Sequence, residues 1–147
     1  MPLPAPEPGL VVCYEFLWSH EFDAGGTQGE KKRPCAIILA SKTDAGQTLV
    51  TVAPITHLEP KYEDRGIEIP PRVKQHLGLD NDPSWVILDE LNEFIWPGYD
   101  LYPIARNRPD KYDYGFLPPR LFDKIRDAIT ALDANIKRII PRDEEDY

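Results

Sequence analysis

The sequence predicts a mainly β fold: a small, strongly bent β-barrel of about five to seven short strands with one α-helix at its C-terminal end. Short segments with the composition or alternation of strands recur along residues 11–104, separated by turn residues. The 16 prolines stand at roughly twice the usual frequency of about 5%, which favours short elements and ordered turns. A helical apolar period occurs only near the C-terminus. At 147 residues the chain has the length of one domain, which we place at residues 9–140.

The N-terminal part predicts a tail, a strand and a long connection. Residues 1–8 contain four prolines, which is typical of a flexible extended tail. Residues 11–16 alternate as a strand should, with Val12, Tyr14 and Phe16 on one face. The following connection, residues 17–32, contains three glycines and is long enough that we expect it to be functional or mobile.

A cluster of positive charge then leads into the most apolar segment of the chain. Lys31, Lys32 and Arg33 directly precede Pro34 and residues 35–41, which are nearly continuously apolar, as in a strand covered on both faces. Proline has no backbone N–H for a sheet ladder, so Pro34 should open the strand. Arg33 is therefore expected at a defined rim of the sheet, where a side chain can be held beside a ligand.

The remaining elements follow from the same patterns. Further strands are expected at residues 48–55, 66–69, 84–89, 91–96 and 101–104, and one helical turn at 71–77. Leu121, Ile125, Ala128, Ile129, Leu132, Ile136 and Ile139 repeat with a helical period. This stripe predicts a terminal helix over about residues 119–140, and residues 141–147 read as an acidic tail.

The composition limits which partners the protein can bind and indicates the cellular compartment in which we expect it. The net charge of −8 is unfavourable for broad binding to nucleic acid, so an RNA site would have to be a local positive patch. Cys13 and Cys35 each lie in an apolar strand pattern and are expected to be free, buried thiols. The chain has neither an apolar run of about 18 residues nor a leader pattern. We expect a cytoplasmic protein with no membrane partner, no metal and no cofactor.

The order of motifs along the chain resembles the PemK/MazF toxins of bacterial toxin-antitoxin systems. The matching features are Pro8, Gly9 and Val11 at the first strand, the glycine-containing connection, Gly29 and Glu30 before Arg33 and Pro34, the run Ala53, Pro54, Ile55 and Thr56, the strand from Val86 to Asp89, and Leu117 with Pro118 before the last helix. The resemblance implies an SH3-like barrel that forms a homodimer, cuts single-stranded RNA without metal and is neutralised by a cognate antitoxin. It also implies that Arg33 and Thr56 act at the scissile phosphate.

The chemistry of these residue types fits such roles. RNA cleavage through its own 2′-hydroxyl needs alignment, proton transfer and stabilisation of charge on phosphorus, and arginine offers a permanently charged forked donor. A threonine hydroxyl can add a hydrogen bond. Proton transfer is more natural for histidine, for which His57 and His20 are the candidates. Contacts to RNA are expected from Lys31, Lys32, Trp18 and Glu30.

The sequence leaves two alternatives open. Residues 91–94 read Leu-Asn-Glu-Phe, where many relatives of the PemK/MazF kind carry a polar segment with arginine. The same fold could therefore serve a gyrase-poison-like toxin, which acts by protein contact. The acidic net charge favours a third hypothesis, a non-catalytic protein-interaction module.

Overall fold

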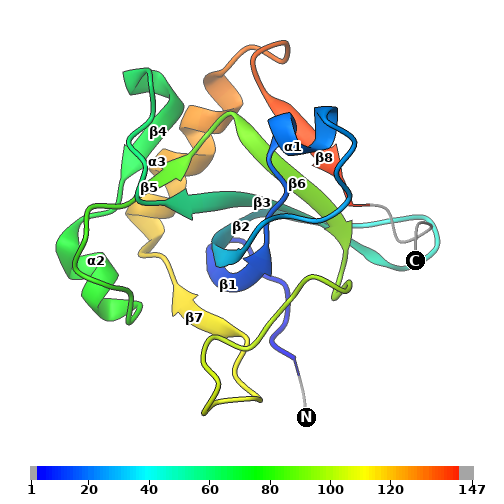
Figure 1. Cartoon of the computed structure of the whole chain (residues 1–147), viewed down its shortest axis with the longest axis horizontal. Helices are drawn as coiled ribbons and strands as arrows, with labels where there is room; N and C mark the ends of the chain where they lie inside the picture. Colours follow the sequence, from blue (N-terminus) through cyan, green and yellow to red (C-terminus); the bar gives the residue numbers. More distant parts are fainter. Residues whose placement is uncertain (1–2, 143–147) are drawn as a thin grey trace.

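The computed structural model describes residues 3–142, which form a mainly β structure with a C-terminal helix, as the sequence predicted (Figure 1). The strands are β1 (Leu10–Glu15), β2 (Lys32–Lys42), β3 (Thr48–Thr56), β4 (Gly66–Glu68), β5 (Trp85–Ile87), β6 (Glu90–Ile95), β7 (Asp113–Phe116) and β8 (Arg138–Pro141). The helices are α1 (Ser19–Asp23), α2 (Pro71–His76) and α3 (Pro119–Ala131), with a 3₁₀ turn at Glu63–Arg65.

The strands form one curled sheet of half-barrel shape in the order β4-β5-β3-β2-β1-β7. These neighbours are all antiparallel. On the edge of β3 that faces away from β2, β6 pairs with the first half of β3 and β5 pairs with its last residues. Strand β8 extends the sheet by pairing parallel with β6. Because β3 has neighbours along both edges, its last residues are fixed in position relative to β2.

Two apolar clusters pack on the opposite faces of β1, β2 and β3. The first contains Val11, Ala36, Ile38, Ala53, Ile55, Ile69, Leu77, Val86, Leu88, Leu91, Leu117, Ile125 and Ile129, and it is covered by α3. The second contains Leu10, Val12, Tyr14, Phe16, Cys35, Ile37, Val50, Val52 and Phe94. Burial on both faces explains why residues 35–38 lack the alternation of a half-exposed strand. Cys13 and Cys35 are both buried free thiols, as expected.

The C-terminal helix is shorter than the apolar stripe suggested. Helix α3 ends at Ala131, not near residue 140, and Leu132 already has an extended backbone. The ammonium group of Lys137 donates to the carbonyl of Ile129 at 3.1 Å, which satisfies one of the last helical carbonyls. The next residues form β8, because a strand there gives the open edge of β6 hydrogen-bond partners and buries Ile140.

The expected tails also need correction at one end. Residues 141–147 do not all form a tail, because Pro141 belongs to β8 and the Arg142 side chain is buried. Residues 143–147 lie outside the described residues. At the other end, residues 3–7 precede the first turn and form neither helix nor strand.

Two further expectations differ from the structure in detail. The region of residues 101–104 contributes one isolated bridge, between Leu101 and Tyr14, instead of a strand. The neighbour of β1 at that edge is β7, which the sequence did not predict. Within residues 3–142, no helix combines the length and the apolar character needed to cross a membrane.

Candidate functional site

The register between β2 and β3 brings the two principal candidates to the same place. Cys35 pairs with Pro54 and Ala36 pairs with Ala53 in the antiparallel ladder. The ladder between β2 and β3 ends at Cys35 and Pro54; continued by two residues, the same register would set Arg33 opposite Thr56, with both side chains on one face. Arg33 and Thr56 accordingly line the same hollow of the surface.

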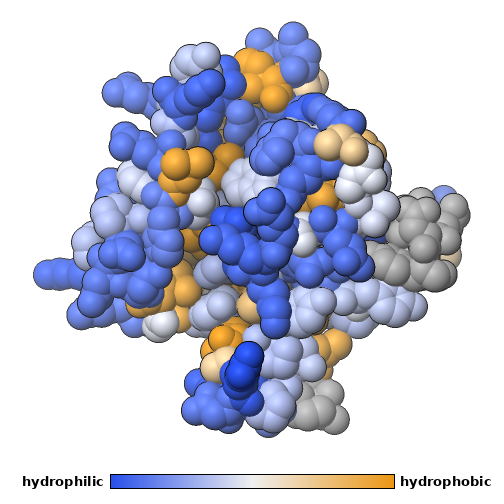
Figure 2. Space-filling model, in the orientation of Figure 1, coloured by the Kyte–Doolittle hydropathy of each residue, from blue (hydrophilic) through white to orange (hydrophobic). Residues whose placement is uncertain are grey.

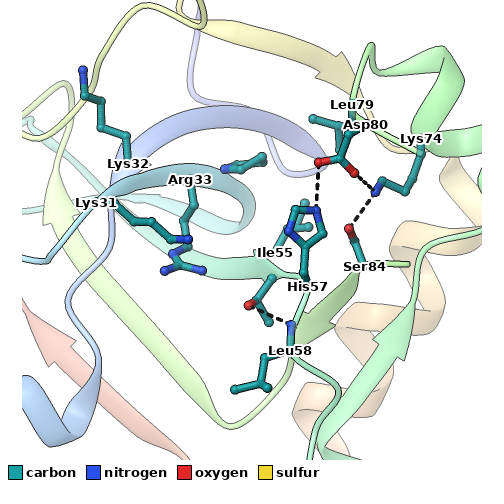
Figure 3. A pocket seen from close by; sticks show the side chains of 12 residues that line it. Lys31, Lys32, Arg33, Ile55, His57, Leu58, Lys74, Leu79, Asp80 and Ser84 are labelled. Carbon is teal, nitrogen blue, oxygen red and sulfur yellow. Dashed lines mark hydrogen bonds and ion pairs between the residues drawn. The ribbon is translucent and has the colours of Figure 1, made fainter. Parts of the chain in front are cut away.

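This first hollow has a volume of about 450 Å³ and is predominantly positive. It is lined by Lys31, Lys32, Arg33, Pro34, Ile55, Thr56, His57, Leu58, Lys74, Leu79, Asp80 and Ser84. The lining contains four cations and one carboxylate, and the carboxylate of Asp80 is already paired with Lys74. The other three cations make the hollow a local positive site on an acidic protein. Figure 3 shows Arg33 and Lys31 close together on one side, with His57 and Asp80 on the other, while Lys32 points away from them.

A second hollow of about 700 Å³ adjoins the first. It is lined by Trp18, His20, Glu21, Glu30, Lys31, Arg33, Thr56, Leu58, Glu59, Pro60, Lys61, Tyr62, Arg65, Ile87, Asp89 and Glu90. The two hollows share Lys31, Arg33, Thr56 and Leu58. Every candidate residue lines at least one of them, but His20, Trp18 and Glu30 line the second only. On the face shown in Figure 2, apolar side chains are scattered over a mainly hydrophilic surface.

Arg33 has donors that the protein leaves unused. Its guanidinium lies over the ring of Trp18, 5.1 Å from the centroid, and its Nε atom is buried without a hydrogen-bond partner. No ion pair to Arg33 occurs in the described part of the chain. Burial lowers the pKa of Arg33, against the opposing effects of Cys35, Glu21 and Glu30, yet a guanidinium stays charged at neutral pH. A buried unpaired donor is costly, but the Nε atom is out of reach of solvent and of a ligand in the hollow. A bound anion would instead meet the terminal guanidinium nitrogens, which donate no hydrogen bond within residues 3–142.

Thr56 ends β3 and keeps its hydroxyl proton available. Its Oγ1 accepts a hydrogen bond from the backbone N–H of Leu58 at 3.2 Å. That contact uses an acceptor lone pair, so the hydroxyl can still donate to a ligand in the hollow. The Leu58 contact also fixes the direction of the hydroxyl oxygen.

His57 belongs to a chain of polar contacts that the sequence did not predict. Its Nε2 lies 2.8 Å from a carboxylate oxygen of Asp80. The other oxygen of Asp80 accepts from Lys74 Nζ at 2.6 Å, and the same ammonium donates to Ser84 Oγ at 2.7 Å. The Lys74 side chain is buried, and it also donates to the carbonyl of Asp82. The aspartate therefore orients the His57 ring, and the lysine fixes the aspartate.

The connection before β2 is held by contacts that place Trp18 beside Arg33. The backbone N–H of Ser19 and its hydroxyl donate to the carboxylate of Glu90 at 2.8 and 2.5 Å. The backbone N–H of Trp18 donates to Glu21 at 2.9 Å at the start of α1. This short helix interrupts the connection that the sequence suggested was a loop. His20 lies exposed on α1, away from the first hollow.

One group of side chains has the composition of a cation site. His57, Asp80 and Asp82 place possible ligand atoms within 4.8 Å of one another, and all three residues are exposed. The ammonium of Lys74 already binds the carboxylate of Asp80 and the backbone of Asp82. This fixed positive charge opposes a divalent ion at the same place, so we assign no metal to the group.

Comparisons with other proteins add no assignment to this geometry. Neither the known family models nor the curated proteins include a match to the chain. The function has to be inferred from the site itself and from the order of motifs in the sequence.

Proposed function

We propose that this chain is a toxin-type endoribonuclease that cuts single-stranded RNA without metal. The observation that supports the proposal most is the state of Arg33: a guanidinium without an ion pair in the described residues 3–142, held over Trp18 in the lining of a positive hollow. Thr56 lines the same hollow and has a hydroxyl proton to donate. A phosphate between the two residues would receive donors from both.

The reaction needs no nucleophile from the protein. The 2′-oxygen of the RNA attacks the adjacent phosphorus, the bond from phosphorus to the 5′-oxygen breaks, and a 2′,3′-cyclic phosphate and a 5′-hydroxyl are formed. One proton leaves the 2′-hydroxyl and one is taken up by the 5′-oxygen. Arg33 and Thr56 would stabilise the negative charge that develops on the phosphate oxygens, an effect worth roughly 10²–10³ in rate for one donor.

His57 is the better candidate for proton transfer. It lines the same hollow as Arg33 and Thr56, whereas His20 lines only the second. The contact between His57 Nε2 and Asp80 leaves the other ring nitrogen to exchange a proton with substrate. We assign Lys31 and Lys32 to phosphate contacts, and Trp18 and Glu30 to bases next to the cut.

The proposed biological setting follows from the same sequence resemblance. We propose a cytoplasmic homodimer whose activity is held in check by a cognate antitoxin. Such a partner would act by covering the hollow around Arg33.

The test is cleavage of a long single-stranded RNA in EDTA by the wild type, Arg33→Ala and Arg120→Ala. Arg120 is an exposed cation on α3 and lines none of the hollows described. We expect cleavage by the wild type and Arg120→Ala, with cyclic phosphate ends, and a loss of roughly 10²-fold or more in Arg33→Ala at an unchanged melting temperature. Wild-type protein that cuts no RNA would contradict the proposal.

The composition of the second hollow favours one other function. Five carboxylates, those of Glu21, Glu30, Glu59, Asp89 and Glu90, line it against four cations. A cationic peptide segment would suit this surface better than a polyanion. If the wild type proves inert towards RNA, a protein-interaction module that binds through this hollow becomes the better hypothesis.

A further inference from the structure

A third hollow, of about 410 Å³, begins on the other side of Lys32. It is lined by Cys13, Lys32, Pro103, Ile104, Ala105, Arg106, Pro109 and Tyr114. Lys32 lines both this hollow and the first one, and its side chain points away from Arg33 and Lys31 (Figure 3). Its ammonium lies 4.5 Å from the centre of the Tyr102 ring, which fixes its position between the two hollows. Lys32 is thus the residue that links the third hollow to the first, which Arg33 lines.

The charges distinguish a path past Lys32 from one through the second hollow. The described residues that line the third hollow include two cations, Lys32 and Arg106, and no carboxylate. Two carboxylates lie near this path. That of Asp113 is already engaged, by Lys111 at 3.4 Å and by the backbone N–H of Gly115 at 3.0 Å. That of Glu15 lies opposite Lys32 in the β1–β2 ladder and offsets part of its charge. The second hollow has five carboxylates among its lining residues. A polyanion that passes Arg33 is therefore favoured to leave along Lys32.

The lining of the third hollow suits one nucleotide. Its volume falls within the range of small-molecule sites, roughly 300–1,000 Å³. Pro103, Ile104 and Pro109 provide apolar walls for a base, and Tyr114 provides a ring, while its hydroxyl is hydrogen-bonded to the Cys13 thiol. Burial raises the pKa of Tyr114, so the hydroxyl remains neutral. Arg106 is exposed and has no ion-pair partner within residues 3–142, which leaves it available for a phosphate.

We propose that the third hollow is a subsite for a nucleotide next to the scissile phosphate, with Lys32 and Arg106 binding the RNA backbone. This inference rests on the proposed nuclease function, because it takes the phosphate at Arg33 as the starting point of the path. In this proposal the bound RNA strand runs from Arg33 towards residues 103–109 and not towards residues 57–65.

The first experiment measures binding without cleavage, so that its failure differs from a failure of the nuclease proposal. A fluorescent pool of short random-sequence oligonucleotides with 2′-O-methyl sugars cannot be cut, and its affinity can be followed against salt concentration. We expect Arg106→Ala to weaken binding by about 3- to 10-fold and to lower the salt slope by about 1. Arg120→Ala should match the wild type. Equal affinities and slopes for all three proteins, or no binding by the wild type, would overturn the subsite.

The second experiment locates the strand. Oligonucleotides of the same kind that carry 4-thiouridine are photo-cross-linked to the wild-type protein, and the attached peptides are identified by mass spectrometry. We expect adducts within residues 103–114. Adducts confined to residues 57–65 would show that the strand leaves through the second hollow and would overturn the proposed direction, whether or not the protein cuts RNA.

Discussion

The side chain of Asn92 replaces a missing strand partner for the backbone of Leu17. Its Oδ1 accepts from the N–H of Leu17 at 2.9 Å, and its Nδ2 donates to the carbonyl of Leu17 at 2.8 Å. The buried guanidinium of Arg142 donates to the same Oδ1 at 3.1 Å and to the carbonyl of Glu15 at 2.7 Å. These contacts fix the chain where it leaves β1, directly before Trp18 and the candidate site.

The first prediction concerns this anchor. Asn92→Leu keeps the approximate volume of the side chain but leaves the buried N–H and C=O of Leu17 without partners, which costs about 1–3 kcal/mol for each unsatisfied group. We expect the free energy of unfolding to fall by about 2–4 kcal/mol in urea titrations. The exposed Asn81→Leu is the control and should remain within about 0.5 kcal/mol of the wild type. Equal urea midpoints of unfolding for Asn92→Leu and Asn81→Leu would mean that the hydrogen bonds between Asn92 and Leu17 do not stabilise the fold.

Asn92 also shows what the sequence alone could not report. Residues 91–94 lack the arginine that many PemK/MazF toxins carry in the corresponding segment, which weakens the resemblance in its RNA-binding part. The structure gives Asn92 a structural role in β6, which depends on hydrogen bonds to Leu17, 75 residues earlier in the chain. No local pattern reports such a contact. Strand β8 is a second example. It is a strand because it pairs with the open edge of β6, although its isoleucines continue the helical period of α3 in the sequence.

The candidate site was predictable to the extent that it follows from local rules. Pro34 was predicted to open the strand, but β2 begins at Lys32 because Arg33 and Pro34 still pair with β1. Arg33 is therefore fixed within the strand, and it lines the same hollow as Thr56, the last residue of the next strand. The contacts of His57 were not predictable, because Asp80 and Lys74 come from a separate loop and from α2. Their approach depends on how α2 packs against the sheet.

The second prediction concerns pH and Asp80. The hydrogen bond from Lys74 is the main reason that the pKa of Asp80 is below its ordinary value, and the backbone N–H of Asp82 adds to the effect. A carboxylate with a lowered folded-state pKa stabilises the fold above its unfolded pKa, about 3.9. This stabilisation is lost as the pH falls through the folded-state pKa.

Asp80→Asn should therefore be less stable than the wild type at neutral pH, and the two melting temperatures should converge below about pH 4. Asp44→Asn, in the exposed turn between β2 and β3, is the control and should show no such convergence. A difference that stays constant from neutral to acid pH would contradict the role of the Lys74 contact.

The third prediction distinguishes the hydrogen-bonding role of the Thr56 hydroxyl from the packing role of its β-branched side chain. Thr56→Val keeps the β-branched form that suits the end of β3 but removes the donor to the proposed phosphate. We expect kcat/KM for RNA cleavage to fall by roughly 10-fold or more, with a small change in melting temperature. Thr56→Ser keeps the hydroxyl and should retain most of the activity. Equal activity in the valine and serine variants would exclude a hydrogen bond from this residue in the rate-limiting step.

The fourth prediction concerns Gly29, in the backbone segment directly before Lys31 and Arg33. A Cβ atom at Gly29 would lie 2.0 Å from the carbonyl oxygen of Phe16 and 2.8 Å from its carbonyl carbon. Neither atom can move without displacing the end of β1, so Gly29→Ala must shift the segment that leads to Lys31 and Arg33. We expect a loss of about 1–3 kcal/mol in the free energy of unfolding.

Because the shift would also misplace the cations, Gly29→Ala should weaken binding of the non-cleavable oligonucleotide pool even at temperatures where the variant is fully folded. Gln28→Ala, one residue earlier and exposed, is the matched control and should bind as the wild type does. Circular dichroism establishes the folded range, and fluorescence anisotropy within it measures affinity. A folded Gly29→Ala protein with wild-type affinity would contradict this prediction. It would mean that the backbone can move elsewhere in the connection to relieve the clash, so the close approach of Gly29 to Phe16 does not position the cations.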